Sequence, residues 1–244
     1  KGGVPNEKIV FHGNNKSDKE IEFAVKNNIK LIVDNYHDLE RLEKISNSIN
    51  LDLEIMVRFT PGIECHTHEY IRTGSFDSKF GFGIESLSNL FSYIRETTHL
   101  KLIGIHAHIG SQIFELEPHK DLGEIMVNVI LEAKKFGHDI QKLNVGGGLG
   151  IKYTESDDPP SIDEWVKTIS RSVVRACKKH NLDLPTLMCE PGRSIVSTAG
   201  ITIYKIGAFK EIPGIRTYLS VDGGMSDNPR PITYQSNYSA CLVS

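Results

Sequence analysis

The sequence lacks the features that several large classes of protein require. Its 244 residues contain 28 lysines and arginines against 31 aspartates and glutamates, so the formal net charge is −3. Proteins that bind nucleic acid or a membrane surface use a clustered basic excess, which this composition does not provide. No apolar run approaches the roughly 20 residues of a membrane-spanning helix. We therefore expect neither a nucleic-acid partner nor a membrane.

Cysteine is also scarce. The chain has four cysteines, Cys65, Cys177, Cys189 and Cys241, which lie far apart with no C-x-x-C pair. Structural zinc sites and disulfide frameworks use tighter spacing. The spacing therefore predicts reduced thiols and a cytoplasmic or plastid-like compartment.

Short apolar runs alternate with helical periods along the first 195 residues. Each run suits a strand that is buried on both faces of a parallel sheet. Apolar residues spaced three or four apart predict helices at residues 122–136 and 165–176. Strand–helix alternation of this kind predicts a right-handed α/β fold. The six predicted strands are residues 9–11, 31–33, 55–57, 102–105, 143–145 and 186–188.

Six strand–helix units fit either an open doubly wound sheet or an eight-stranded barrel that lacks two units. The position of the chemistry favours the barrel, whose phosphate sites often follow the seventh and eighth strands. If two units precede residue 1, the strands before Gly146 and Glu190 become the seventh and eighth. Both are followed by residues suited to binding phosphate. We predict a (β/α)8 barrel that lacks its first strands.

Beyond the sixth strand the pattern changes. Residues 199–210 and 217–221 are predicted strands with no helix between them. We predict that residues 1–197 form the partial barrel and residues 198–244 the beginning of an incomplete β domain. The longest predicted loop covers residues 61–83, and a loop of that length in a compact domain is usually functional.

A run of glycines follows the fifth predicted strand. Gly146, Gly147, Gly148 and Gly150 leave a backbone that can approach an anion closely and turn its N–H groups toward it. The run does not fit the G-x-G-x-x-G dinucleotide pattern, and it lacks the Lys-Ser/Thr pair of a P-loop. A phosphate site and a plain tight turn both remain open for this run.

A carboxylate and an arginine follow the sixth predicted strand. Glu190 comes first, a Pro-Gly turn follows, and Arg193 completes the motif. Arginine grips anions through its planar fork. A carboxylate opposite a pyridine nitrogen would keep that nitrogen protonated and make the ring an electron sink. The alternative is an ordinary ion pair at a surface turn.

Histidines end another predicted strand. Strand alternation puts His106 and His108 on one face, a second H-x-H pair occupies residues 66–68, and His12 follows the first strand. Metal hydrolases use such pairs, but a metal site needs further histidines at later strand ends. Those positions carry glycine and glutamate. We predict no metal, and instead a ring-stacking histidine followed by a phosphate-binding Ser111.

The segment of residues 222–234 is rich in turn-forming residues, which usually indicates a plain loop. Arg230 lies between two prolines and is therefore rigidly presented. Tyr234 follows four residues later and can share its target. The two side chains together suit a carboxylate.

The motifs together resemble those of the alanine-racemase-fold decarboxylases that use pyridoxal 5′-phosphate (PLP). The resemblance covers nearly the whole chain; each motif is weak alone, but six in the family's order are specific. The stretch of residues 225–230 and Gln112 point to the diaminopimelate decarboxylase branch over ornithine or arginine decarboxylases. The motifs are residues 12–17, residues 73–74 with 79–81, residues 108–111, 146–148, 190–193 and 222–224.

The resemblance implies PLP as cofactor and the decarboxylation of meso-2,6-diaminopimelate to L-lysine, the last step of lysine biosynthesis. It also implies a homodimer with shared active sites. His108 would stack on the PLP ring, and Glu190 would pair with the pyridine nitrogen. Further cofactor contacts are implied for Ser111, Gly147, Gly148, Gly192 and Arg193, and substrate contacts for Arg193, Arg230 and Tyr234.

Two parts of the family's active site are not expected within this chain. The lysine that holds the cofactor in the family lies on the first barrel strand, which we expect upstream of residue 1, and Lys16 belongs to another motif. A Cys-Glu-Ser segment of the partner subunit is expected beyond Ser244. We therefore expect a fragment that is inactive alone. The alternatives are a decarboxylase of another basic amino acid and a non-catalytic homologue that regulates such an enzyme.

Overall fold

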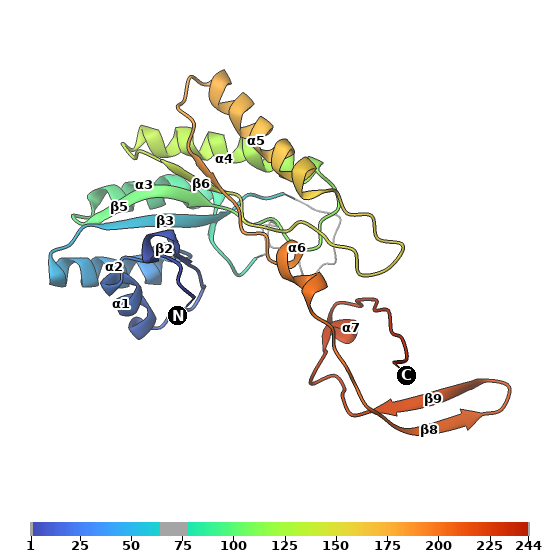
Figure 1. The fold of residues 1–244 in the computed structure, drawn as a ribbon. Helices are drawn as coiled ribbons and strands as arrows, with labels where there is room; N and C mark the ends of the chain where they lie inside the picture. The colour runs from blue at the N-terminus through green and yellow to red at the C-terminus, as the bar shows by residue number, and fades with distance from the viewer. Residues whose placement is uncertain (1, 64–77, 244) are drawn as a thin grey trace.

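The computed structural model describes residues 2–63 and 78–243. Its main sheet is parallel, with the strands in the order β1-β2-β3-β5-β6-β7 and with β4 paired to β3 (Figure 1). Neighbours that follow chain order are typical of a barrel, whereas a doubly wound sheet reverses its order at a switch point. The barrel prediction is confirmed. The strands are β1 (Val10–Phe11), β2 (Lys30–Val33), β3 (Leu53–Thr60), β4 (Phe82–Gly83), β5 (Leu100–His106), β6 (Lys142–Asn144) and β7 (Thr186–Met188).

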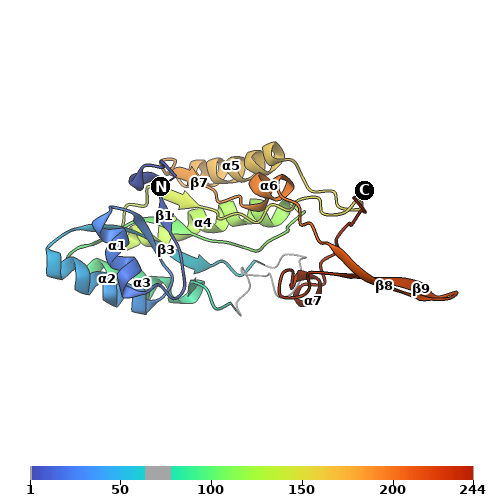
Figure 2. The same ribbon diagram turned by 60° about the horizontal axis from the view of Figure 1, so that its bottom comes forward.

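Helices follow the strands and lie along the sheet (Figure 2). Two of them begin with a capping box, in which Ser17 and Glu20, or Ser161 and Glu164, satisfy each other's backbone N–H groups. Both helices predicted from apolar spacing are present, as α4 and α5. The helices are α1 (Asp18–Lys26), α2 (Tyr36–Ile49), α3 (Leu87–Glu96), α4 (Glu117–Lys135) and α5 (Ile162–Lys179).

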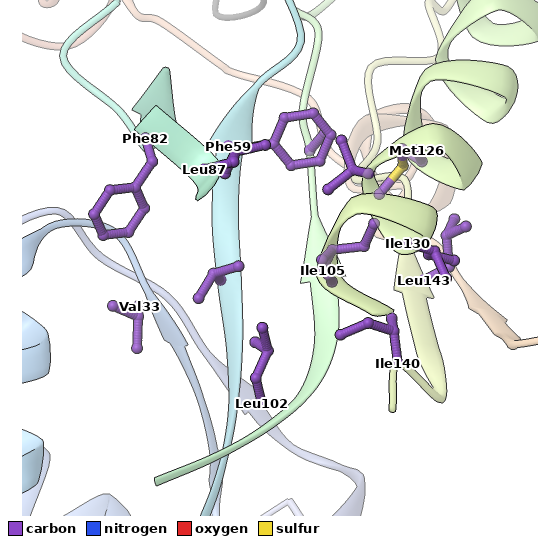
Figure 3. Close-up of a cluster of buried hydrophobic side chains, with 14 of the residues drawn as sticks. Val33, Phe59, Phe82, Leu87, Leu102, Ile105, Met126, Ile130, Ile140 and Leu143 are labelled. Carbon is purple, nitrogen blue, oxygen red and sulfur yellow. The ribbon is translucent and has the colours of Figure 1, made fainter. Parts of the chain in front are cut away.

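The core has two layers on opposite faces of the sheet. The larger packs the outer strand face against the helices, as Figure 3 shows for Ile105 and Leu143 beside Met126 of α4. The smaller joins Ile32, Met56 and Ile103 with two partly buried side chains at the sheet edges, and every member comes from a strand. Because side chains alternate along a strand, this second layer lines the inside of the barrel.

The loop predicted for residues 61–83 is partly wrong. Phe82 and Gly83 form β4, because Phe82 pairs with Phe59 of β3 and its side chain is only 5% exposed. The histidine pair of residues 66–68 and the Thr-Gly motif of residues 73–74 lie outside the described residues.

The strand predicted at residues 199–210 starts later than expected. Ala199, the first residue of that range, ends a short helical stretch formed by α6 (Arg193–Val196) and a 3-10 helix (Ser197–Ala199). β8 (Ile206–Ile212) then pairs antiparallel with β9 (Arg216–Val221), and the hairpin projects away from the barrel (Figures 1 and 2). A further short helix, α7 (Arg230–Thr233), lies in the turn-rich segment.

His119 of α4 is buried against Trp165 of α5, with the ring centroids 5.6 Å apart. Neither ring nitrogen has a hydrogen-bond partner among residues 2–63 and 78–243. Burial lowers the pKa of His119 to about 4, so the folded protein holds this side chain neutral at pH values where an unfolded chain protonates it.

Stability should therefore fall as the pH drops from about 6.5 to about 4, by on the order of 3 kcal/mol from this group. We expect His119→Phe to narrow the difference between the thermal midpoints at pH 8 and pH 5. His37→Phe, on a side chain that is 72% exposed, is the control and should leave that difference unchanged. If the thermal midpoint of His119→Phe falls between pH 8 and pH 5 by as much as that of the unaltered protein, the prediction is contradicted.

Candidate functional site

Each parallel strand of the main path carries a polar side chain near its carboxyl end. Four of these residues come two positions after a residue of the interior layer, as Asp34 does after Ile32, and His106 and Asn144 lie in register with Arg58 across the neighbouring strands. The carboxyl ends of barrel strands are where active sites form. We call this set the polar layer; its members are His12, Asp34, Arg58, His106, Asn144 and Glu190.

Glu190 is the centre of the polar layer. Its Oε1 accepts hydrogen bonds from His12 Nε2 at 2.6 Å and from Asn144 Nδ2 at 2.8 Å. Its Oε2 lies 3.4 Å from His106 Nε2. The side chain is 34% exposed, so one edge of the carboxylate faces the barrel mouth.

The surroundings of Glu190 favour its ionised form. Burial alone raises the pKa of a carboxyl group, but the polar N–H groups of the neighbouring His106 and His12 rings hold the pKa of Glu190 well below its usual range. Glu190 is therefore a carboxylate at every physiological pH.

The two histidines of the H-x-H motif are neutral. Burial lowers the pKa of His106 to about 4, and burial with the positive charge of Arg58 does the same for His108. Gly147 N–H donates to His108 Nδ1 over 3.2 Å, which requires a lone pair on that nitrogen. A neutral ring with a fixed tautomer suits stacking on another aromatic ring.

The glycine run is wedged between two loops. A Cβ atom on Gly147 would collide with the backbone oxygen of Glu190, and one on Gly148 would lie 2.6 Å from the oxygen of Gly110. Gly146 and Gly148 also have φ angles of 67° and 105°, which disfavour other residues. Glycine is therefore required here by close backbone packing, whatever the run binds.

Asp34 and Arg58 form a second pair of charged groups within the polar layer. Arg58 Nη1 lies 3.7 Å from Asp34 Oδ1, and Gly81 N–H donates to Asp34 Oδ2. Burial raises the pKa of Asp34. The Arg58 guanidinium stacks 4.4 Å above the Phe80 ring, so the motif of residues 79–81 packs against this part of the site.

Lys16 is buried in an ion pair that supports the fold. Its Nζ donates to Asp38 Oδ2 at 2.5 Å and to the Gly13 backbone oxygen at 2.6 Å, and its side chain is 2% exposed. Arg41 bonds the other oxygen of Asp38. Lys16 therefore belongs to a buried ion-pair network between the turn after β1 and α2.

The predicted substrate residues meet each other. Arg230 at the start of α7 lies 5.3 Å from the centroid of the Tyr234 ring and 5.9 Å from that of Tyr153. Tyr153, from the loop after the glycine run, was not anticipated. The remaining predicted residues, Ser111, Gly192 and Arg193, follow β5 and β7 at the same end of the barrel.

Sequence reasoning missed three members of the polar layer as functional residues: Asp34, Arg58 and Asn144. It weighed His12 and His106 only as metal ligands. The signal was available, because Asp34 and Arg58 directly follow predicted strands and Asn144 lies within one, each on the face opposite the buried outer residues. His12, His106 and Glu190 also place one ligand atom each within 4.8 Å of one another, a spacing that a metal ion accepts. The absence of a metal therefore stays a prediction.

The site fits an aromatic cofactor with an anionic tail. Glu190 offers an anionic oxygen to a protonated ring nitrogen, and His108 offers a neutral ring beside it. The glycine run forms a cradle in which no side chain has room. Ser194 Oγ is buried next to Arg193, and no described residue satisfies it. A phosphate beside this hydroxyl would supply the missing acceptor.

Comparison with known proteins identifies the family. The profile of the pyridoxal binding domain of pyridoxal-dependent decarboxylases matches residues 1–197. The chain belongs to this family. Its cofactor is therefore PLP.

Several relatives of the chain are diaminopimelate decarboxylases. The chain is 55% identical over 238 residues to the diaminopimelate decarboxylase of Synechocystis and 41% identical to that of Bacillus subtilis. These matches cover 98% and 99% of this chain but only 51% and 56% of the two relatives. The chain therefore spans about half the length of these relatives. The diaminopimelate decarboxylase of Helicobacter pylori, solved with L-lysine, superposes with a TM-score of 0.87 at 32% identity, over 97% of this chain and 58% of that one.

Packing around the glycine run generates a stability prediction. Gly147→Ala forces the loop after β7 to move, and overpacking of this kind costs about 1–3 kcal/mol. We expect the thermal midpoint to fall by roughly 3–10 °C. Gly200→Ala is the matched control, because a Cβ there meets open space. Equal midpoints for the two variants would show that the collision is relieved without cost.

Proposed function

We propose that the protein containing this chain decarboxylates meso-2,6-diaminopimelate to L-lysine with PLP. The observation that carries the proposal is the ionised Glu190 carboxylate, presented to the barrel mouth on a scaffold similar to diaminopimelate decarboxylases. Bound PLP supplies a ring that accepts the electron pair left behind when a carboxylate departs as CO₂.

Each residue of the site has a role in this proposal. Glu190 keeps the pyridine nitrogen protonated, and neutral His108 stacks on the ring. His106, which is 1% exposed beside Glu190, excludes water from this part of the site. The phosphate is bound by Ser111, Gly147, Gly148, Gly192 and Arg193.

The substrate assignment depends on Arg230 and Tyr234. A second, distal carboxylate gives Arg230 a charged partner, whereas the distal amine of ornithine or lysine would place a cation against it. The alternative is a related decarboxylase of another basic amino acid. A non-catalytic regulator is less consistent with the site, because Gly148, Glu190 and Arg193 are all present.

The domain, assembly and location proposals follow the same reasoning. We propose that residues 1–197 form the cofactor barrel and that residues 198–244 belong to a β-rich second domain. The enzyme is proposed to be a homodimer in the cytoplasm or a plastid-like compartment. Cys177, Cys189 and Cys241 are free, which supports a reducing location. No helix in the described part of the chain is long and apolar enough to cross a bilayer.

The role of Glu190 can be tested in the intact protein. Glu190→Ala should retain bound PLP, measured by its visible absorbance, because the phosphate and stacking contacts remain. CO₂ release should fall by roughly a hundredfold or more, since the ring loses its electrostatic partner. Glu155→Ala, in an exposed loop, is the control. Decarboxylation by Glu190→Ala at the parental rate would exclude the pyridinium role.

The substrate can be tested with Arg230→Ala. Loss of a charge-assisted contact costs about 1.5–3 kcal/mol, so kcat/KM for diaminopimelate should fall about ten- to a hundredfold. Any trace activity on lysine should barely change. Arg216→Ala is a matched control, because Arg216 also lies over a tyrosine ring, that of Tyr218, but on the β8–β9 hairpin. Equal losses on both substrates would assign Arg230 to the fold or the cofactor.

A further inference from the structure

The two oxygens of Glu190 have unequal surroundings. Oε1 accepts two hydrogen bonds, from His12 and Asn144, which fills its two lone-pair directions. Among residues 2–63 and 78–243, Oε2 faces only His106 Nε2 at 3.4 Å, and neither nitrogen of that buried ring has a hydrogen bond there. One oxygen is therefore saturated by the protein, and the other is left for a further donor.

Both donors to Oε1 have a fixed direction. Asn144 Oδ1 accepts the Gly146 N–H at 3.0 Å, so its amide nitrogen must face Glu190. The carboxylate can only accept, so His12 Nε2 carries the proton in their 2.6 Å hydrogen bond. The direction of these two hydrogen bonds cannot reverse unless the Asn144–Gly146 hydrogen bond breaks or the carboxylate becomes protonated.

His12 is held in place by a buried ion pair. The next residue, Gly13, gives its backbone oxygen to Lys16 Nζ, which also bonds Asp38. The side chains of Lys16 and Asp38 are 2% and 1% exposed. The turn that carries His12 is therefore anchored to α2. This turn follows β1, at the opposite edge of the sheet from β7 and Glu190.

The position of the shared proton depends on these contacts. A proton between a carboxylate and a pyridine nitrogen resides on whichever group binds it more tightly. Hydrogen bonds to the carboxylate weaken its hold on a proton, while burial strengthens it. The other charged or titratable groups around Glu190 are His106, His108 and Arg58, and only Arg58 is charged at neutral pH.

We infer that His12 and Asn144 are positioning residues that reserve Glu190 Oε2 for the pyridine nitrogen and keep the shared proton on the ring. The inference rests on the proposed PLP role of Glu190. Without these donors the carboxylate takes the proton, and the ring becomes neutral and a weaker electron acceptor. Neither residue touches the reacting atoms.

The test follows the ring nitrogen directly. The intact protein is loaded with PLP labelled with ¹⁵N in the pyridine ring, and the ¹⁵N chemical shift is measured between pH 6 and pH 9. The unaltered protein should show a protonated nitrogen throughout. His12→Phe, Asn144→Leu and the double variant should move the signal toward that of neutral pyridine. Their kcat should fall about tenfold or more, with KM changed less than about threefold.

Two comparisons separate positioning from a structural role. His12→Gln retains a donor and should restore the protonated signal. His99→Phe removes a similar contact, the 2.9 Å His99–Asp52 hydrogen bond at the other end of the sheet, and should leave the ring nitrogen protonated. Thermal midpoints show which variants fold. If His12→Phe does not fold, the ¹⁵N shift of Asn144→Leu provides the test.

Three results would overturn the inference. The first is a protonated ring in the folded double variant, and the second is a neutral ring in the unaltered protein. The third is stoichiometric zinc in the purified protein that His12→Phe removes, which would make the cluster a metal site. A protein with the expected ¹⁵N shifts that does not decarboxylate diaminopimelate would overturn the proposed substrate and leave the inference standing.

Discussion

The hydrogen bond between His12 and Glu190 joins the two edges of the parallel sheet. His12 follows β1 and Glu190 follows β7, the first and last strands of the path, 178 residues apart in sequence. In a flat sheet five strand spacings would separate these strands by about 24 Å. The atoms lie 2.6 Å apart, so the sheet must curl until both edges present their ends to one interior. The other members of the polar layer converge for the same reason.

Charge within the polar layer is balanced by neutralising some groups and pairing others. Burial removes the charge from His106 and His108, while Arg58 remains charged between Asp34 and Glu190. A buried arginine needs such partners, since an uncompensated charge in this interior would cost several kcal/mol. Glu190 can stay ionised because imidazole and amide N–H groups donate to it. The layer thus presents one oxygen of a hydrogen-bonded carboxylate to a bound ring.

Sequence patterns predicted the parts of this fold that depend on local information. Short apolar runs gave all six strands of the main path, and apolar spacing gave α4 and α5. β4 was missed because two residues carry no periodicity, and Phe82 is buried only through its partner Phe59. The polar layer was seen only in part. Asn144 and Glu190 belong to different strands, and their contact depends on sheet register and curvature, which no single motif encodes.

The glycine run has a second role that its sequence pattern does not predict. Its spacing suggests an anion cradle, yet its backbone also orients the rest of the site. Gly146 N–H fixes the Asn144 amide, Gly146 O receives the Glu190 N–H at 2.7 Å, and Gly147 N–H fixes the His108 tautomer. A side chain at either glycine would press on His108 or on the loop that carries Glu190. The same turn that can approach a phosphate thus determines how the carboxylate and the stacking ring meet the cofactor, and binding and chemistry are coupled through one stretch of backbone.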